Sequence, residues 1–358
     1  MHTSEWVSLG HPDKMADFIS EYILDKHLEK DPQTRYAVEV QIKDNHVCLA
    51  GEVTTKANFS MEDIEGFVRT AVNVIGYTPE YQKKFGMHNT ICGDVLNVDS
   101  YIYSQSPDIA VGVNRDAWGD QGIFFGYYNG QTVDGMGWDY GLAKEIGMKL
   151  YEEALRPESP LGLDIKTQVT IDGNEIEQVI VAVPSVPGNT EYTKIVRKII
   201  RKVCNVLPPK KIIINGTGEY HIHGPVGDCG TTGRKLVVDF YGGRSRIGGG
   251  SPWTKDGSKA DLTLNIFARD CAETYFHDIS RATHVEWVET ELSCCIGKQD
   301  ITCTCKAFSS DGMLISKHEN RAKIKPSDLI KIYKLDKPIY SELCAKGIFT
   351  AIEHKIDL

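Results

Sequence analysis

The order in which helical and strand-like segments follow one another is the feature that most constrains the fold of this 358-residue chain. Apolar residues recur at helical spacing after Pro12, and two alternating segments follow at residues 37–42 and 47–53. Helices and strands are then mixed without strict strand–helix–strand alternation. This order predicts an α+β fold rather than a regular series of βαβ units.

The remaining elements are predicted from the same two periodicities. We expect helices at residues 62–75, 140–155, 192–206 and 260–275, with a last helix at 326–333 that completes the chain. We expect strands at residues 167–171, 177–183, 211–214, 285–296 and 301–307. Loop and strand are expected over 101–126, and a long glycine-rich region covers 216–257.

The first two strand segments also predict a register. A two-residue turn at residues 44–45 pairs Glu39 with Ala50, and Ala37 with Glu52. Glu39 and Glu52 then project from the same face as diagonal neighbours, about 7–8 Å apart. Two such carboxylates suit a cation or an ammonium group. A solvated outer face of the sheet is the alternative interpretation.

Composition narrows the class of protein. Forty basic residues against 49 acidic ones give a net charge of −9, which argues against a general binder of nucleic acid or of anionic membranes. No apolar run is long enough to span a membrane, and the first residues lack the pattern of a secretory signal, so we expect an intracellular, cytoplasmic protein. Ten cysteines without a C-x-x-C pair are expected to be mostly reduced core residues.

Charged side chains gather in four glycine-containing segments. Residues 10–14 (Gly-His-Pro-Asp-Lys) open the first helix, whose free N–H groups favour phosphate; His11 and Lys14 add donors, and Asp13 could hold magnesium. Residues 224–235 place Asp228, Arg234 and Lys235 among closely spaced glycines, without forming a Walker A loop.

The other two segments are residues 248–261, with two lysines and two aspartates before a helix, and residues 119–122 (Gly-Asp-Gln-Gly). A capped helix with surface charges is the alternative for residues 10–14, and a surface loop is the alternative for residues 248–261.

These segments carry a resemblance. The chain resembles the S-adenosylmethionine synthetase (methionine adenosyltransferase) family along nearly its whole length. Seven motifs occur in the family's order: Gly-His-Pro-Asp-Lys at 10–14, Gly-Glu-Val-Thr-Thr at 51–55, Gln-Ser-Pro-Asp-Ile at 105–109, Gly-Asp-Gln-Gly at 119–122, Gly-Asp-Cys-Gly at 227–230, Thr-Gly-Arg-Lys at 232–235 and Gly-Gly-Gly-Ser at 248–251.

The resemblance implies a fold and a reaction. The fold is three similar α/β domains around a pseudo-threefold axis, with sequence segments at residues 1–99, 108–218 and 219–358 whose structural domains can interleave. The reaction joins ATP and L-methionine: sulfur attacks the ribose 5′ carbon, and the released triphosphate is hydrolysed to pyrophosphate and phosphate. Two Mg²⁺ ions and K⁺ are the implied cofactors. The implied assembly is a homodimer, or a dimer of dimers, with active sites at the subunit interface.

The resemblance also implies residue roles. The catalytic set is His11, Lys166, Arg234, Lys235, Lys255 and Lys259, and these same residues bind ATP together with Asp164, Glu219, Tyr220, Asp228 and Ser251. Methionine is assigned to Glu52, Gln105, Asp120, Asp228, Lys259 and Ile296. Asp13 and Asp261 are the implied Mg²⁺ ligands, and Glu39 is the implied K⁺ ligand.

The chain departs from the family's pattern in several places. Leu9 replaces the usual Glu before residues 10–14, Glu219 stands where Arg normally precedes the stacking aromatic residue, and the segment between Asp108 and Gly119 is shortened. These departures keep two other hypotheses open. One is a non-catalytic ATP- or methionine-binding regulator, and the other is a magnesium-dependent triphosphate hydrolase.

Overall fold

The computed structural model describes residues 1–104, 116–132 and 134–355. Its helices are α1 (Pro12–Lys30), α2 (Met61–Ile75), α3 (Pro79–Phe85), α5 (Trp138–Ala154), α6 (Tyr192–Val203), α7 (Leu236–Asp239), α8 (Ala260–Ser280), α9 (Pro326–Ile332) and α10 (Tyr340–Lys346). Its strands are β1 (His2–Val7), β2 (Arg35–Lys43), β3 (His46–Thr54), β4 (Asn97–Tyr103), β5 (Gly122–Asn129), β6 (Lys166–Asp172), β7 (Glu175–Ala182), β8 (Lys211–Ile214), β9 (Gly230–Thr231), β10 (Trp287–Cys294), β11 (Asp300–Phe308) and β12 (Leu314–Lys323).

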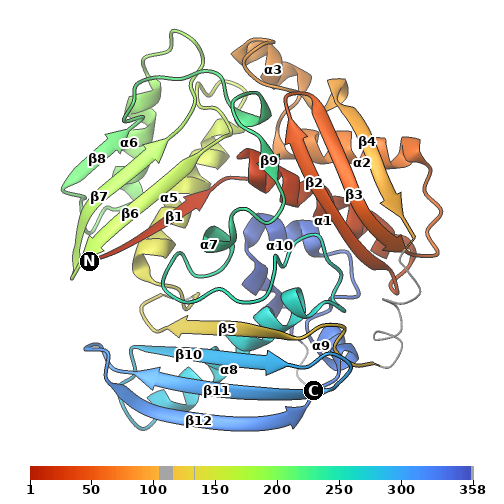
Figure 1. The fold of residues 1–358 in the computed structure, drawn as a ribbon. Coiled ribbons are helices and arrows are strands. Elements are labelled where there is room, and N and C mark those ends of the chain that lie inside the picture. Colours follow the sequence, from red (N-terminus) through yellow and green to blue (C-terminus); the bar gives the residue numbers. More distant parts are fainter. Residues whose placement is uncertain (105–115, 133, 356–358) are drawn as a thin grey trace.

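Within the described residues, the strands form three four-stranded sheets that surround a central group of helices (Figure 1). Their orders are β4-β3-β2-β9, β1-β6-β7-β8 and β12-β11-β10-β5. Each sheet is built on one helix followed by a hairpin: α1 with β2 and β3, α5 with β6 and β7, and α8 with β10 and β11. The prediction of an α+β fold with three similar domains is therefore confirmed.

Each hairpin also pairs with a strand from elsewhere in the chain. β9 lies antiparallel to β2, β1 to β6, and β5 to β10. In the first two sheets a helix follows the hairpin and leads into a parallel fourth strand, β4 or β8. In the third sheet β12 follows β11 directly and is antiparallel to it. Distant parts of the sequence are thus tied together by backbone hydrogen bonds in every sheet.

The register predicted for the first hairpin is confirmed. Glu39 pairs with Ala50, and Ala37 pairs with Glu52. The turn is closed at Asp44, whose φ of 49° lies in the left-handed region that Asp tolerates. Val38, Val40 and Ile42 face the core while Glu39 is exposed, so alternation along β2 places the two glutamates on the outer face.

Helix α1 occupies the centre of the molecule and is buried along most of its length (Figure 1). Pro12 takes the first helical position, and the side chain of His11 caps the helix by accepting a hydrogen bond from Asp13 N at 3.1 Å. Met15, Ile19 and Ile23 are buried, as the helical spacing predicts. The buried positions of α1 also include several charged side chains, which the spacing alone does not predict.

Sequence analysis missed some elements. β1 and β9 were not predicted because each is a short strand that pairs with a distant hairpin. The prediction that a helix at 326–333 completes the chain is wrong, since α10 follows it. β12 was missed because its central residues are polar on both faces. In the part of the chain that the structure describes, no helix has the length and apolarity needed to cross a membrane.

The packing of α8 on β5 leads to a prediction of stability. A Cβ atom on Gly126 would lie 1.9 Å from the carbonyl oxygen of Ala268, so helix and strand would have to separate. We expect Gly126→Ala to lower the free energy of unfolding by about 3 kcal/mol in urea denaturation. Gly66→Ala in α2, where a Cβ atom meets nothing within 4 Å, is the control; it should raise that free energy by about 0.5–1 kcal/mol. Equal stability of the two variants would contradict the close approach.

Candidate active site

The first group of predicted site residues surrounds the N-terminus of α1. Nδ1 of His11 accepts the capping hydrogen bond from Asp13 N, so the neutral imidazole must carry its proton on Nε2. Burial, with the nearby charge of Lys235, lowers the pKa of His11 to about 4. His11 is therefore a neutral hydrogen-bond donor at pH 7, held in one tautomer by the helix that it caps.

Asp13 gathers two cations from the glycine-rich segment. Its carboxylate lies 2.5 Å from Nζ of Lys235 and 3.7 Å from Arg234, and it accepts a hydrogen bond from Thr231 N at 3.0 Å. Although burial opposes its ionisation, the hydrogen bonds from Lys235 and Thr231 hold the pKa of Asp13 below its usual value. The predicted neighbours His11, Asp13, Arg234 and Lys235 thus come together.

Three further predicted residues lie beside them. Lys166 and Asp228 both act on the pKa of His11, and Lys166 and Lys235 act on that of Asp164. Burial raises the pKa of Asp164 to about 7, while its Oδ2 accepts a hydrogen bond from Gly224 N at 3.0 Å. We call these residues the first cluster: His11, Asp13, Asp164, Lys166, Asp228, Arg234 and Lys235.

Tyr220 adjoins this cluster, and Glu219 precedes it in the chain. Tyr220 is half-buried, and burial together with the charge of Asp164 raises the pKa of its phenol. The carboxylate of Glu219 accepts a hydrogen bond from Ser185 Oγ at 2.8 Å and lies 3.9 Å from His221. The reversed charge at Glu219 is therefore directed toward Ser185 and His221.

A second group of predicted residues lies around the start of α8. Nζ of Lys255 is 2.5 Å from Asp261, whose other carboxylate oxygen accepts a hydrogen bond from Gly250 N at 2.7 Å. The loop that carries Ser251 packs against the first cluster's loop, because a Cβ atom on Gly233 would lie 2.9 Å from Ser251. Two glycine-rich segments therefore meet side by side.

Glu39 belongs to this second group. Oε1 of Glu39 accepts a hydrogen bond from Thr254 Oγ1 at 3.1 Å, and Oε2 accepts one from Thr232 Oγ1. The backbone at Lys255 bridges to Ala37, which pairs with Glu52 on its other side. The second cluster thus consists of Glu39, Glu52, Ser251, Lys255, Lys259 and Asp261.

The remaining predicted residues differ in their surroundings. Lys259 binds the buried carboxylate of Asp256 at 2.5 Å. Asp120 and Ile296 are exposed where β5 begins and β10 ends, and Cys294 at that end of β10 donates to the carbonyl of Asp120. Gln105 lies outside the described residues, as does most of the shortened segment.

The side chains near each proposed ligand show which metal-binding modes are available for the implied Mg²⁺ and K⁺ ions. Among the described residues, no group of three or more His, Cys, Asp or Glu side chains could hold a metal ion. Mg²⁺ commonly binds proteins through one or two carboxylates plus substrate phosphates, so single acids such as Asp13 and Asp261 fit that mode. Glu39 with two threonine hydroxyls is a set of oxygen atoms that suits a hard cation.

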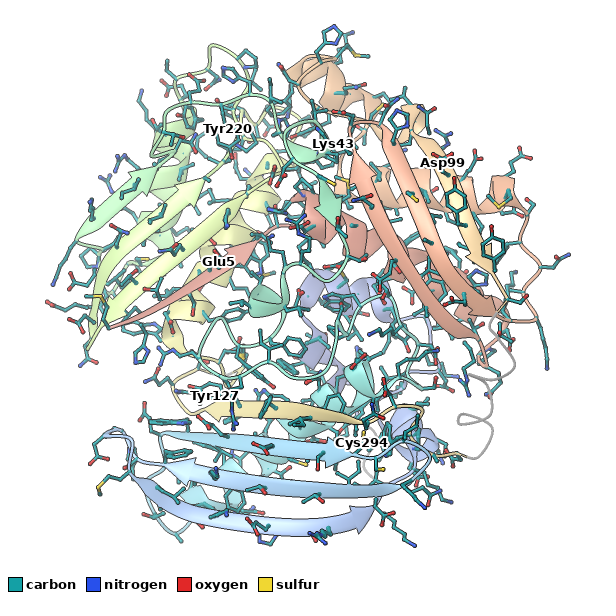
Figure 2. The ribbon with its side chains drawn as sticks, viewed as in Figure 1. Glu5, Lys43, Asp99, Tyr127, Tyr220 and Cys294 are labelled. Atoms are coloured by element: carbon teal, nitrogen blue, oxygen red, sulfur yellow. The ribbon has the colours of Figure 1, made fainter. Side chains whose placement is uncertain are left out.

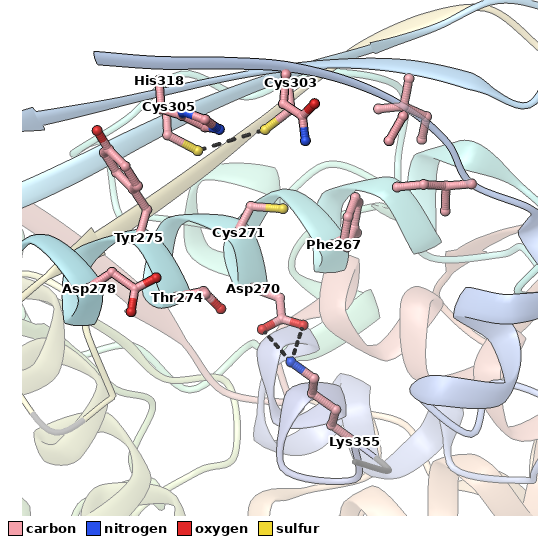
Figure 3. Close-up of a pocket in the computed structure, with 14 residues that line it drawn as sticks. Phe267, Asp270, Cys271, Thr274, Tyr275, Asp278, Cys303, Cys305, His318 and Lys355 are labelled. Atoms are coloured by element: carbon pink, nitrogen blue, oxygen red, sulfur yellow. Dashed lines mark hydrogen bonds and ion pairs between the residues drawn. The ribbon is translucent and has the colours of Figure 1, made fainter. Parts of the chain in front are cut away.

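A cavity of about 510 Å³ lies elsewhere, between α8 and the strands β11 and β12 (Figure 3). Cys271, Cys303 and Cys305 contribute to its lining, with the sulfurs of Cys303 and Cys305 3.7 Å apart. All ten cysteines are free thiols, but only five of them are buried, so the prediction of mostly core residues holds for half of them. None of the residues predicted for ATP, methionine or metal binding lines this cavity.

Sequence analysis missed several residues that contact the predicted ones. Glu5 extends from β1 and lies 3.5 Å from Nζ of Lys166 (Figure 2). Thr232, Thr254 and Asp256 bind Glu39 or Lys259. The sequence offered a signal for these three residues. Thr232 is close in sequence to Arg234 and Lys235, and Thr254 and Asp256 flank Lys255. Glu5 offered none, because β1 was not predicted.

Known proteins of one family resemble the chain along nearly its whole length. Family models of S-adenosylmethionine synthetase match the chain over residues 1–107 (N-terminal domain), 115–227 (central domain) and 222–357 (C-terminal domain). A solved structure described as an unusual S-adenosylmethionine synthetase from Campylobacter jejuni is 29% identical, with a TM-score of 0.84 and 98% of each chain covered.

The fold and the matched domains define a three-domain α+β transferase. The chain belongs to the S-adenosylmethionine synthetase family, and it is an enzyme of the methionine adenosyltransferase class.

The buried ion pairs of α1 predict a dependence of stability on pH. Nζ of Lys14 binds Asp17 at 3.1 Å and Asp239 at 2.7 Å, and burial raises the pKa of Asp17 to about 7 even with this cation present. Lys14→Met should cost about 3–5 kcal/mol at neutral pH, because two buried carboxylates lose their partner.

The cost of Lys14→Met should grow with pH. Without Lys14, the folded variant retains a proton on Asp17 that the unfolded chain releases above about pH 4, so its free energy of unfolding falls as pH rises. Urea denaturation at pH 5 and pH 8 measures this slope. Lys194→Met, at an exposed ion pair, is the control, and a slope in Lys14→Met equal to that of the wild type would contradict the assignment.

Proposed function

We propose that this chain makes S-adenosylmethionine from ATP and L-methionine, with release and hydrolysis of triphosphate. The observation that carries the proposal is the meeting of Lys235 and Arg234 with Asp13 beside a neutral His11. Cations and a hydrogen-bond donor therefore converge where a helix N-terminus already favours phosphate.

The proposed transfer reaction needs few catalytic groups other than cations and hydrogen-bond donors. A thioether sulfur has no proton to lose, so its attack on the ribose 5′ carbon needs no general base. The difficulty lies in the leaving triphosphate, whose negative charge must be stabilised as the bond breaks. Lys166, Arg234 and Lys235 from the first cluster, with Lys255 from the second, are the proposed partners of that charge.

His11 is proposed to act at the breaking bond. With Nδ1 occupied by the helix cap, its Nε2–H is free to donate a hydrogen bond to the oxygen that leaves the 5′ carbon. Its pKa of about 4 keeps it a neutral donor across the physiological range. Asp164 of this cluster and the adjoining Tyr220, both half-buried, are proposed to contact the ribose and to stack on the adenine.

Asp13 and Asp261 are the proposed Mg²⁺ ligands, and Glu39 is the proposed K⁺ ligand. Bound Mg²⁺ supplies positive charge to phosphate oxygens. In this chain the two acids also hold Lys235 and Lys255. A divalent cation at either acid would compete with the lysine and leave its ammonium group to the phosphates.

The two clusters are proposed to act across a homodimer. Each cluster reaches the surface, since Arg234, Lys166, Glu39 and Glu52 are all exposed. If the first cluster of one subunit faces the second cluster of its partner, the two half-sites complete each other. Pairing of dimers into tetramers and a cytoplasmic location stay predictions.

A reaction mixture tests the proposed activity. Incubation with ATP, methionine, Mg²⁺ and K⁺ should yield S-adenosylmethionine, pyrophosphate and phosphate, measured by mass spectrometry and phosphate assay. Lys255→Met should lower turnover at least about a hundredfold, because it removes a charge from the leaving group. Lys194→Met, which removes an exposed ion pair with Glu191 and belongs to neither cluster, should retain wild-type turnover.

Other outcomes separate the competing hypotheses. Calorimetric binding of ATP and methionine without any product would indicate a regulatory homologue. Phosphate release from triphosphate that does not depend on methionine would indicate a hydrolase. Wild-type turnover in Lys255→Met would refute the role of that residue.

Mixing of inactive variants tests the shared site. Lys235→Met and Lys255→Met disable different clusters, so a mixed dimer keeps one site built from two intact halves. Random mixing makes half of the dimers mixed, and activity should return to about a quarter of the wild-type value. Lys235→Met mixed with Asp13→Asn, which disables the same cluster, should show no such recovery. Absence of recovery in the first mixture would mean that the clusters act within one chain.

A further inference from the structure

Four acidic side chains on α1 hold distant loops in place. Asp13, Asp17, Glu21 and Asp25 lie four residues apart, which keeps them on adjoining parts of the helix surface. All four are buried, and each accepts a backbone hydrogen bond from the second half of the chain: from Thr231 N, Gly233 N, Thr254 N, and Tyr340 N with Ser341 N, respectively. We call these four residues the acidic row.

Glu21 is the least satisfied member of the acidic row. Its Oε1 accepts from Thr254 N at 2.5 Å, while Oε2 has no hydrogen-bond partner among the described residues. The charged and titratable groups that interact with it are Asp17, Asp25 and Lys14 on its own helix, Tyr36 on β2, and Tyr340 and Cys344 on α10. Burial raises the pKa of Glu21 well above its usual value.

The partner of Glu21 has an unusual backbone. Thr254 has a φ of 74°, a left-handed conformation that a β-branched residue adopts only at a cost of about 1–3 kcal/mol. Its polar groups are all engaged: N with Glu21, the carbonyl with Val38 N at 3.1 Å, and Oγ1 with Glu39 at 3.1 Å. The surroundings thus fix a conformation that the residue by itself disfavours.

The strained residue stands directly before a proposed catalytic one. Lys255 follows Thr254, bridges to Ala37 of β2 and directs its ammonium group to Asp261. A rotation of the Thr254 backbone would shift Lys255 and would also break the contact with Glu39. The direction of both side chains therefore depends on the hydrogen bond between Glu21 and Thr254.

We propose that Glu21 is a positioning residue, which holds Thr254 in its left-handed conformation and thereby sets Lys255 and Glu39 for the transfer reaction. The inference rests on the proposed function of Lys255. It assigns Glu21 a role through a hydrogen-bond acceptor oxygen, which differs from a role as a metal ligand.

Asp25 provides a matched control on the same helix. It is also buried and also binds backbone N–H groups, but those belong to α10 rather than to a proposed site loop. Glu21→Met and Asp25→Leu each replace a buried carboxyl group by an apolar side chain of similar size. Both variants leave N–H groups unpaired, and we expect both to lose stability.

Turnover separates the two roles. We expect Glu21→Met to lower kcat by about 10- to 100-fold with little change in KM for ATP or methionine, because a displaced Lys255 acts mainly in the transition state. Asp25→Leu should retain kcat within about twofold, and Glu21→Gln, which keeps an acceptor oxygen, should restore most of it. Equal losses of kcat in Glu21→Met and Asp25→Leu, no loss in Glu21→Met, or a loss in Glu21→Gln as large as in Glu21→Met would each overturn the proposal.

A second measurement uses the wild-type protein alone, so it does not depend on whether a variant folds. Hydrogen exchange of the wild-type protein should show slow exchange at the Thr254 amide, since its N–H is buried in a bond to Glu21; fast exchange there would also overturn the proposal. Wild-type turnover is measured alongside every variant. A wild-type protein without product counts against the proposed function, whereas an active wild type with an equally active Glu21→Met counts against the positioning role alone.

Discussion

Helix α1 lies at the centre of three sheets with five of its Asp, Glu and Lys side chains buried, and the rest of the structure provides partners for them. A buried carboxylate or ammonium group costs several kcal/mol unless it is paired or hydrogen-bonded. Lys14 meets Asp17 and Asp239, and the acidic row meets backbone N–H groups of loops that lie more than 200 residues further along the chain. The core and the glycine-rich loops are thus parts of one hydrogen-bonded arrangement.

This arrangement explains why the proposed site lies where it does. The first member of the acidic row, Asp13, holds Lys235 and Arg234 at the helix N-terminus, and the third, Glu21, holds the loop of Lys255. One rigid helix therefore sets the position of both clusters. Because side chains on helices hold their geometry better than side chains on free loops, the glycine-rich segments gain precision from their contacts with α1.

The parts of the structure that depend on a local sequence pattern could be predicted from the sequence. Alternation and a two-residue turn fix the register of β2 and β3, and Pro12 fixes the start of α1. β1 and β9 could not be predicted in this way, because each gains its stability by pairing with a hairpin far away in sequence. The four-residue spacing of Asp13, Asp17, Glu21 and Asp25 was visible, but only the packing shows that this face of the helix is buried. The motifs named most site residues, yet their division into two clusters depends on tertiary contacts.

The pairing of acids with lysines in these clusters follows from electrostatics. Several cations gathered for a polyphosphate would repel one another, and an acid beside each lysine removes that cost: Asp13 beside Lys235, Asp261 beside Lys255 and Asp256 beside Lys259, each at 2.5 Å. The three acids differ in one respect. Asp256 accepts two backbone hydrogen bonds, from Tyr36 N and Ser258 N, whereas Asp13 and Asp261 each accept one, from Thr231 N and Gly250 N respectively. Asp13 and Asp261, the proposed Mg²⁺ ligands, are therefore held by fewer backbone hydrogen bonds than Asp256, the partner of Lys259.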